Sequence, residues 1–319
     1  MARRALQQGL LVKGIVRTET GSKEIETLGI QAFICPGYFV NELEHAFKDV
    51  SAIVHLVATA KGPERKLDEV NVRVLDRVIE AAKKAGVKKI VYLSGLGVGF
   101  DDAYPAGLAP YFYSKERGEY KVKHAGIPYV IFRPSFIVGP GDGFTRAVVN
   151  AIAGGYVRLP APEGATMQPV SIDDATDAIL AAATDPHIAN ITCDLVGPES
   201  ILVDTIVMDM FQAIRDSNVK ISAPVIEHVP PGKQDPTIDE SFEFLVCTVK
   251  GNPSTVINDL GVQVTPVGGT IAAAVRDILK PDEPVPEKRA IMLFSGGLDS
   301  VTTLYWMRSQ GYDVIPLSM

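Results

Sequence analysis

The chain has 319 residues, of which 46% are hydrophobic and 22% are charged, a composition typical of a globular protein with a sizeable core. Its formal net charge of −7 argues against a general nucleic-acid-binding protein, because such proteins carry a basic surface. The sequence contains no run of about 18 apolar residues, so it predicts no transmembrane helix. The 3 cysteines are widely spaced and form no Cys-x-x-Cys pair, which indicates a reducing, cytoplasmic compartment and argues against a disulfide framework or a metal site.

Short apolar runs with strand character alternate with helical segments through residues 1–280. The runs cover residues 10–16, 32–35, 52–57, 89–94, 129–132 and 193–197. Apolar side chains from Leu67 to Ala82 recur at three- and four-residue spacing, which predicts an amphipathic helix that ends at Gly86. This alternation predicts an α/β fold with a doubly wound parallel sheet, of Rossmann-like type. The loops after the strands are then expected to line one ligand-binding cleft.

Tyr111 and Lys115 lie four residues apart in a segment with helical character, so both face the same side of one predicted helix. A phenol with a pKa of about 10 is a poor acid–base catalyst at neutral pH. A nearby ammonium group favours the phenolate and lowers that pKa. This is the physical argument for a Tyr-x-x-x-Lys pair in acid–base catalysis. The position of the pair between two strand-like runs, rather than the spacing alone, indicates it here.

Three segments together resemble the extended and atypical short-chain dehydrogenase/reductase superfamily, of the NAD(P)-dependent epimerase/dehydratase type. They are VNVRVLDRVIEAAKKAGVKKIVYLSGLG, PYFYSKERGEYKVKHAGIPYVIFRPSFIVGPGD and MQPVSIDDATDAILAAATDP. The resemblance covers residues 1–280 and points within the superfamily to the atypical, NmrA-like group. It implies an oxidoreductase or epimerase-type protein with NAD or NADP as cofactor and a small-molecule substrate, and it is compatible with a homo-oligomer.

The resemblance also implies roles for individual residues. Tyr111 matches the general acid/base, and Lys115 matches the residue that lowers its pKa and holds the nicotinamide ribose. Ser94 is the third candidate catalytic residue. Arg17 matches a position that meets the adenosine ribose or its 2′-phosphate, which favours NADP. The remaining positions matched to cofactor binding are Ala58, Thr59, Arg133, Pro134 and Ser135.

Three departures from the family pattern leave a second interpretation open. Leu96 stands where the family usually has its catalytic serine or threonine, and Cys35-Pro36 replaces an acidic adenine contact. The Gly-rich turn that seats the cofactor diphosphate is missing, together with a central strand, about 15 residues in all. We therefore expect an N-terminally truncated domain. A non-catalytic nucleotide-binding scaffold or redox sensor is the alternative function.

The last part of the chain predicts a separate structural element. Three prolines within residues 281–289 predict an extended linker. Residues 290–319 then predict a strand, a tight turn, a helix and a second strand. One further alternative is that residues 291–294 pair with the runs at Leu11 or Ile53 and replace the missing strand.

The turn in this last segment resembles the PP-loop of ATP pyrophosphatases. It consists of Ser295, Gly296, Gly297, Leu298, Asp299 and Ser300. Glycines let the backbone approach a phosphate, and the following helix N-terminus directs free N–H groups at an anion. The resemblance is closest to the start of 7-cyano-7-deazaguanine synthase, which implies ATP with Mg and a C–N ligase of queuosine or archaeosine precursor synthesis if the chain continues. An ordinary strand–turn–helix with a capping Asp299 or Ser300 is the alternative.

Overall fold

The structure, a computed structural model, describes residues 1–99, 104, 107–229, 242, 244–245 and 249–280, and the backbone of two strands at 289–294 and 313–318. The chain divides into two compact units, Met1–Ile278 and Leu279–Met319. The first unit contains the main sheet and the helices that cover it.

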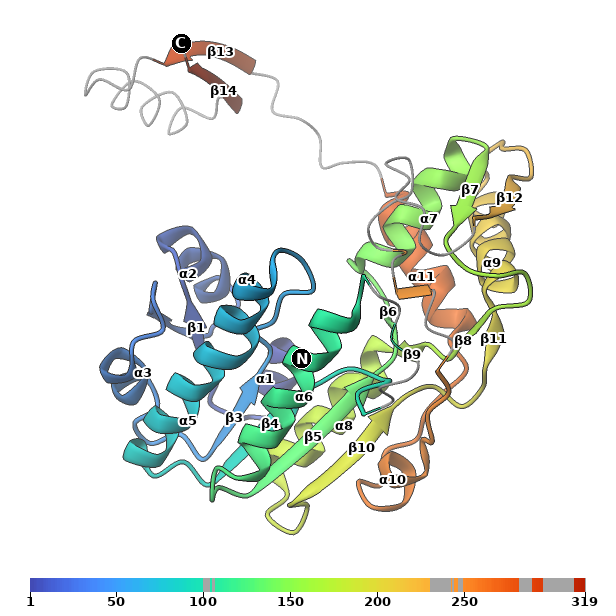
Figure 1. The fold of residues 1–319 in the computed structure, drawn as a ribbon. Coiled ribbons are helices and arrows are strands. Elements are labelled where there is room, and N and C mark those ends of the chain that lie inside the picture. The colour runs from blue at the N-terminus through green and yellow to red at the C-terminus, as the bar shows by residue number, and fades with distance from the viewer. Residues whose placement is uncertain are drawn as a thin grey trace. The chain divides into compact units, whose positions relative to one another are not determined.

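A four-stranded parallel sheet forms the centre of the first unit (Figure 1). Its strands lie in the order β3 (Ala52–His55), β4 (Lys89–Leu93), β5 (Tyr129–Pro134) and β10 (Ile191–Leu195). Ile90, Tyr92 and Ile131 pack with the helices of one face, whereas Val91 and Phe132 pack in the cluster on the other face. Because successive strand residues point to opposite faces, both faces of the sheet are covered by helices. The expectation of a Rossmann-like parallel α/β fold is confirmed.

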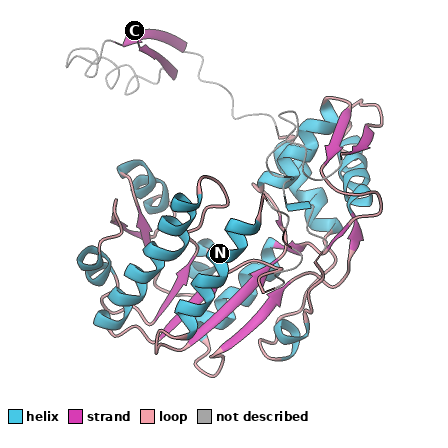
Figure 2. Ribbon diagram, viewed as in Figure 1, coloured by secondary structure: helices cyan, strands magenta, loops and turns pink. Residues whose placement is uncertain are grey.

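Helices on both sides complete these layers (Figure 2). They are α1 (Ala2–Gln7), α4 (Glu64–Asp68), the π-helical turn η1 (Glu69–Arg73), α5 (Val74–Ala85), α6 (Ala109–Lys123), α8 (Ile172–Thr184) and α10 (Ser254–Asn258). Helix α5 ends at Gly86, whose φ of 71° is left-handed, as the sequence predicts. Helix α8 contacts β3 and β4, and α6 contacts β4 and β5.

A second parallel pair, β1 (Lys13–Val16) with β2 (Gln31–Ile34), forms its own sheet beside helices α2 (Glu19–Glu26) and α3 (Val40–Ala46). Among the described residues, no strand joins this pair to the four-stranded sheet.

The rest of the first unit is a smaller group of elements. Helices α7 (Gly143–Ala153), α9 (Val203–Asp216) and α11 (Gly268–Ile278) pack on one another. Short strand pairs accompany them: β6 (Ile137–Val138) with β9 (Val170–Ser171), β7 (Tyr156–Leu159) with β12 (Val225–His228), and β8 (Thr166–Met167) with β11 (Ile201–Leu202). In the part of the chain that the structure describes, no helix is long and apolar enough to span a membrane.

The second unit contains a two-stranded parallel sheet of β13 (Arg289–Phe294) and β14 (Asp313–Ser318). Parallel neighbours need a crossover connection, so this pairing agrees with the predicted strand–turn–helix–strand order. The strand β13 pairs with β14. The alternative in which residues 291–294 pair with the runs at Leu11 or Ile53 stays a prediction. The predicted loop Ser295–Ser300 lies outside the described residues, and its ATP-binding role stays a prediction.

Candidate functional site

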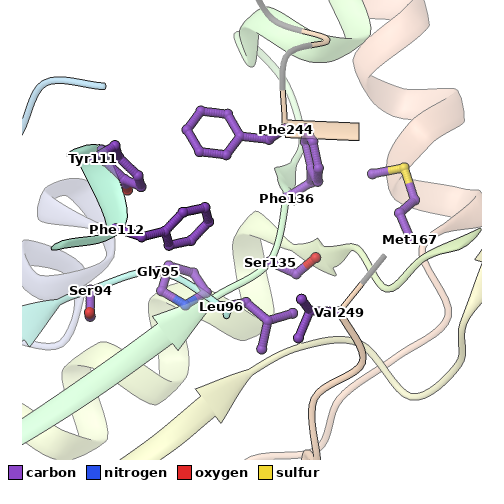
Figure 3. Close-up of a pocket in the computed structure, with 11 residues that line it drawn as sticks. Ser94, Gly95, Leu96, Tyr111, Phe112, Ser135, Phe136, Met167, Phe244 and Val249 are labelled. Carbon is purple, nitrogen blue, oxygen red and sulfur yellow. The ribbon is translucent and has the colours of Figure 1, made fainter. Parts of the chain in front are cut away.

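A cavity of about 220 Å³ opens beside the carboxyl ends of β4 and β5, next to the first turn of α6 (Figure 3). Open parallel α/β sheets bind their ligands at this edge. The described residues that line the cavity are Ser94, Gly95, Leu96, Tyr111, Phe112, Pro134, Ser135, Phe136, Met167, Phe244 and Val249. The sequence-predicted residues Ser94, Tyr111, Pro134 and Ser135 thus meet in one place.

Tyr111 lies in the first turn of α6, and its phenol oxygen lies close to Gly95. A methyl group placed on Gly95 would lie 3.4 Å from that oxygen. The ring makes edge-to-face contacts with Phe112, at 5.4 Å between ring centroids, and with Phe244, at 5.2 Å. Burial in these surroundings raises the pKa of Tyr111 to about 12. The expectation that Lys115 lowers this pKa stays a prediction.

Lys115 follows one turn later and is almost completely buried, with 1% of its surface exposed. Its Nζ donates a hydrogen bond to the Leu93 carbonyl oxygen at 2.5 Å and lies 4.6 Å from the centroid of the Tyr92 ring. Burial lowers the pKa of Lys115 to about 8, against the opposing effect of the Glu119 carboxylate. The ammonium group is therefore directed at the end of β4, and it keeps donor capacity for a further acceptor there.

Glu119, a third residue on the same face of α6, is the centre of a buried ion-pair network. Its carboxylate accepts two hydrogen bonds from Arg133, at 2.8 and 2.9 Å, and one from the Ser94 hydroxyl at 2.7 Å. Lys123 Nζ lies 3.2 Å away. Burial opposes ionisation, but the hydrogen bonds of Arg133 and Ser94 and the nearby cations outweigh it and lower the pKa of Glu119.

This network changes the roles expected for two residues. The Nε and Nη2 groups of Arg133 are held by Glu119, and Arg133 is not among the described residues that line the cavity. The Ser94 hydroxyl donates its hydrogen to Glu119, so in this arrangement it cannot also donate to a substrate carbonyl. Arg133 and Ser94 therefore fix the strand ends against α6 rather than presenting free donors to the cavity.

Asn71 connects the loop after β3 to the helix that carries Tyr111. Its side-chain oxygen accepts from the Thr59 N–H at 2.8 Å, and its Nδ2 donates to the Thr59 carbonyl and to Ser114 Oγ, each at 2.8 Å. Ser114 in turn donates to the Tyr111 carbonyl at 2.6 Å. Asn71 belongs to the π-helical turn η1, a distortion that is frequent at functional sites. The loop of Ala58 and Thr59 is thereby positioned relative to Tyr111.

Arg17 lies apart from the cavity. It is exposed directly after β1, and its charge acts on Tyr38, where burial raises the phenol pKa and Arg17 opposes that shift. Tyr38 has a φ of 51°, an uncommon backbone angle outside glycine. Arg17 and Tyr38 thus form a second polar position at the carboxyl ends of β1 and β2, which the cavity residues do not share.

Several lining residues were not identified from the sequence. Phe136, Met167, Phe244 and Val249 come from distant segments, and their apolar character alone could not distinguish them from core. Glu119 carried a signal, because it stands four residues after Lys115 and eight after Tyr111, on the same helical face.

The donor set fits one half of a dinucleotide. Lys115 Nζ and the Tyr111 hydroxyl have the chemistry to bind ribose hydroxyls. Tyr111 lines the cavity, whereas Lys115 is 1% exposed and is not among the described lining residues. The diphosphate half has no Gly-x-Gly-x-x-Gly turn in this sequence. Residues Tyr111 and Lys115 would hold the nicotinamide ribose, and the loop of Ala58 and Thr59 would border the diphosphate.

Comparison with known proteins shows the family to which this chain belongs. A family model described as NAD(P)H-binding matches residues 1–186. An uncharacterized sugar epimerase, YhfK of Bacillus subtilis, is 22% identical over 200 residues, which are 61% of this chain and 86% of that protein. The UPF0659 protein YMR090W of Saccharomyces cerevisiae is 32% identical over 111 residues, which are 34% of this chain and 48% of the yeast protein.

Solved structures show the same fold. The NAD complex of UDP-glucose 4-epimerase from Thermus thermophilus has a TM-score of 0.69 and 19% identity, and the match covers 87% of this chain and 94% of that one. The NAD⁺ complex of the Bordetella bronchiseptica enzyme WbmH has a TM-score of 0.68 and 21% identity, covering 88% and 93% of the two chains. The chain therefore belongs to the NAD(P)H-binding family and has the Rossmann-type fold seen in NAD-binding epimerases.

Proposed function

We propose that the protein is an NAD(P)-dependent oxidoreductase or epimerase-type protein of the atypical short-chain dehydrogenase group, with Tyr111 as its general acid/base. The observation that carries this proposal is the phenol of Tyr111 at the wall of the cavity, with Lys115 one helical turn behind it. A bound nicotinamide supplies or accepts a hydride. The protein's own part is to hold and move a proton at the substrate oxygen.

In the reducing direction Tyr111 donates its phenolic proton to a substrate carbonyl oxygen while the carbonyl carbon gains the hydride. The C=O π bond would be lost as C–H and O–H bonds form, with the hydride supplied by a bound reduced nicotinamide, and the Tyr111 phenolate would regain a proton from solvent. The high pKa of Tyr111 keeps the phenol protonated at neutral pH, so the proton is available for this direction. The buried ammonium of Lys115 stabilises the phenolate that forms.

Two measurements test this proposal. Isothermal titration calorimetry measures the binding of NAD⁺ and NADP⁺, and absorbance of the reduced nicotinamide measures turnover of a panel of ketones, secondary alcohols and sugar nucleotides. We expect Tyr111→Phe to bind dinucleotide as the native protein does and to turn over about 10²–10⁴-fold more slowly. Native dinucleotide binding combined with unchanged turnover in Tyr111→Phe would exclude Tyr111 as the acid/base.

A non-catalytic nucleotide-binding protein or redox sensor is the second candidate. The hydrogen bond from Ser94 to Glu119 favours it, since this serine is not a free donor for substrate, and Leu96 stands where the family usually has a hydroxyl. It predicts dinucleotide binding by calorimetry with no turnover of any substrate in the panel.

For residues 290–319 we retain the PP-loop interpretation, with ATP and Mg as ligands of residues 295–300. The parallel pairing of β13 and β14 supports the strand–turn–helix–strand order that this interpretation requires. Calorimetric titration of the chain with ATP and Mg²⁺, compared with an Asp299→Ala variant, tests it. Equal heats for the two proteins would reject it.

A further inference from the structure

We propose that the cavity accepts a carbonyl or secondary alcohol borne by an apolar, ring-sized group rather than a polyhydroxylated sugar nucleotide. This inference rests on the proposed function and specifies its substrate class.

The described lining of the cavity is mostly apolar. Its side-chain polar groups are the hydroxyls of Ser94, Tyr111 and Ser135, and no charged side chain is among the described lining residues. The Ser94 hydroxyl donates to Glu119, and Tyr111 is the group assigned to the reacting oxygen. Ser135 is then the remaining side-chain donor that this lining offers to the rest of a ligand.

Aromatic side chains form one side of the cavity (Figure 3). Phe112 and Phe244 meet edge-to-face at 6.2 Å between ring centroids, and Phe244 meets Tyr111 edge-to-face at 5.2 Å. Phe136 packs on Phe144 at 5.0 Å, which holds its ring beside the same space. Edge-to-face and offset contacts of this kind suit a further planar ring.

A sugar nucleotide fits this lining poorly. An apolar pocket prefers a ligand that lacks a hydroxyl to one whose hydroxyl finds no hydrogen-bond partner, by a factor on the order of 10². A pyranose carries several hydroxyls, whereas Ser135 is one donor. A diphosphate also needs cationic or backbone N–H partners, and the described lining includes no cationic side chain.

Isothermal titration calorimetry with two probes, acetophenone and UDP-glucose, tests the inference on the full chain. The oxidised dinucleotide is present, so acetophenone binds without being reduced. We expect acetophenone to bind at least about 10-fold more tightly than UDP-glucose. Phe244→Ala should weaken acetophenone binding about 10–100-fold and Phe244→Leu less. Tyr120→Ala, which removes a ring that is 64% exposed on α6, is the control and should leave the affinity unchanged.

A second variant keeps the test decisive if Phe244→Ala fails to fold. Val249→Thr keeps the volume of a lining side chain and adds a hydroxyl, and it should weaken acetophenone binding about 10-fold. Absence of acetophenone binding, tighter binding of UDP-glucose, or an affinity that neither variant changes would each overturn the inference and leave the proposed function standing. Absence of dinucleotide binding in the first titration would overturn both.

Discussion

Replacing Glu119 by Gln removes one charge from the buried network and leaves its shape in place. The Glu119 side chain is 3% exposed, and among the described residues its carboxylate accepts four hydrogen bonds, two from Arg133, one from Ser94 and one from Lys123. Removing one partner of a buried ion pair costs about 3–5 kcal/mol because the other charge stays behind. The Arg133 side chain is 23% exposed, so part of its charge is solvated and we expect the lower end, about 3 kcal/mol.

Urea unfolding followed by circular dichroism measures this loss at neutral pH. Glu116→Gln is the matched control, since Glu116 lies on the same helix and no ion pair involves it among the described residues.

The pH dependence supplies a second readout. The lowered pKa of Glu119 stabilises the folded protein fully above the unfolded value of about 4.3, and this contribution disappears as the pH falls through the lower folded pKa. Glu119→Gln should lack that acid-dependent part. A difference from Glu116→Gln below about 1 kcal/mol would refute the assignment of a strong buried pair.

Three further variants test other parts of the site. Asn71→Ala should lower the free energy of unfolding by about 2–3 kcal/mol, measured by urea unfolding, because it leaves buried polar groups of the loop after β3 without partners. Lys115 has a folded pKa of about 8, below its unfolded value of about 10.4, so native stability should rise by up to about 3 kcal/mol as the pH increases through this interval, and Lys115→Met should abolish the rise. Gly118→Ala should lower the thermal midpoint, with a cost of about 1–3 kcal/mol, because a methyl group there would lie 2.2 Å from the Tyr92 hydroxyl oxygen. Gly268→Ala, where nothing lies within 4 Å of the added methyl, is its calorimetric control; equal midpoints for the two variants would contradict the packing argument.

Local periodicity explains how much of this fold could be predicted. Continuous apolar runs identify buried strands, and the three- and four-residue spacing from Leu67 to Ala82 identifies α5 with its end at Gly86. The same periodicity places Tyr111 and Lys115 on one face of α6. These features depend on residues that are close in the chain, so they are readable from it.

The properties that the sequence analysis missed depend on contacts between distant segments. The direction of the Tyr111 pKa shift is set by burial, to which Phe244 contributes from more than a hundred residues away in the sequence. Lys115 directs its Nζ at Leu93, and Arg133 is held by Glu119 on another element. No local pattern specifies which of several candidate partners a long charged side chain selects.

The division between the β1–β2 pair and the four-stranded sheet has a consequence for opening motions. No ladder of backbone hydrogen bonds between described strands connects the two parts, and α3 links them through apolar contacts of Leu43 and Phe47 in the cluster that contains α5. Cooperative unfolding units follow such boundaries. The amides of β1 and β2 should therefore exchange with deuterium through a lower-energy opening than those of β4 and β5. The part of the molecule around β1 and β2, which carries Arg17, can then open while the sheet beside Tyr111 stays folded.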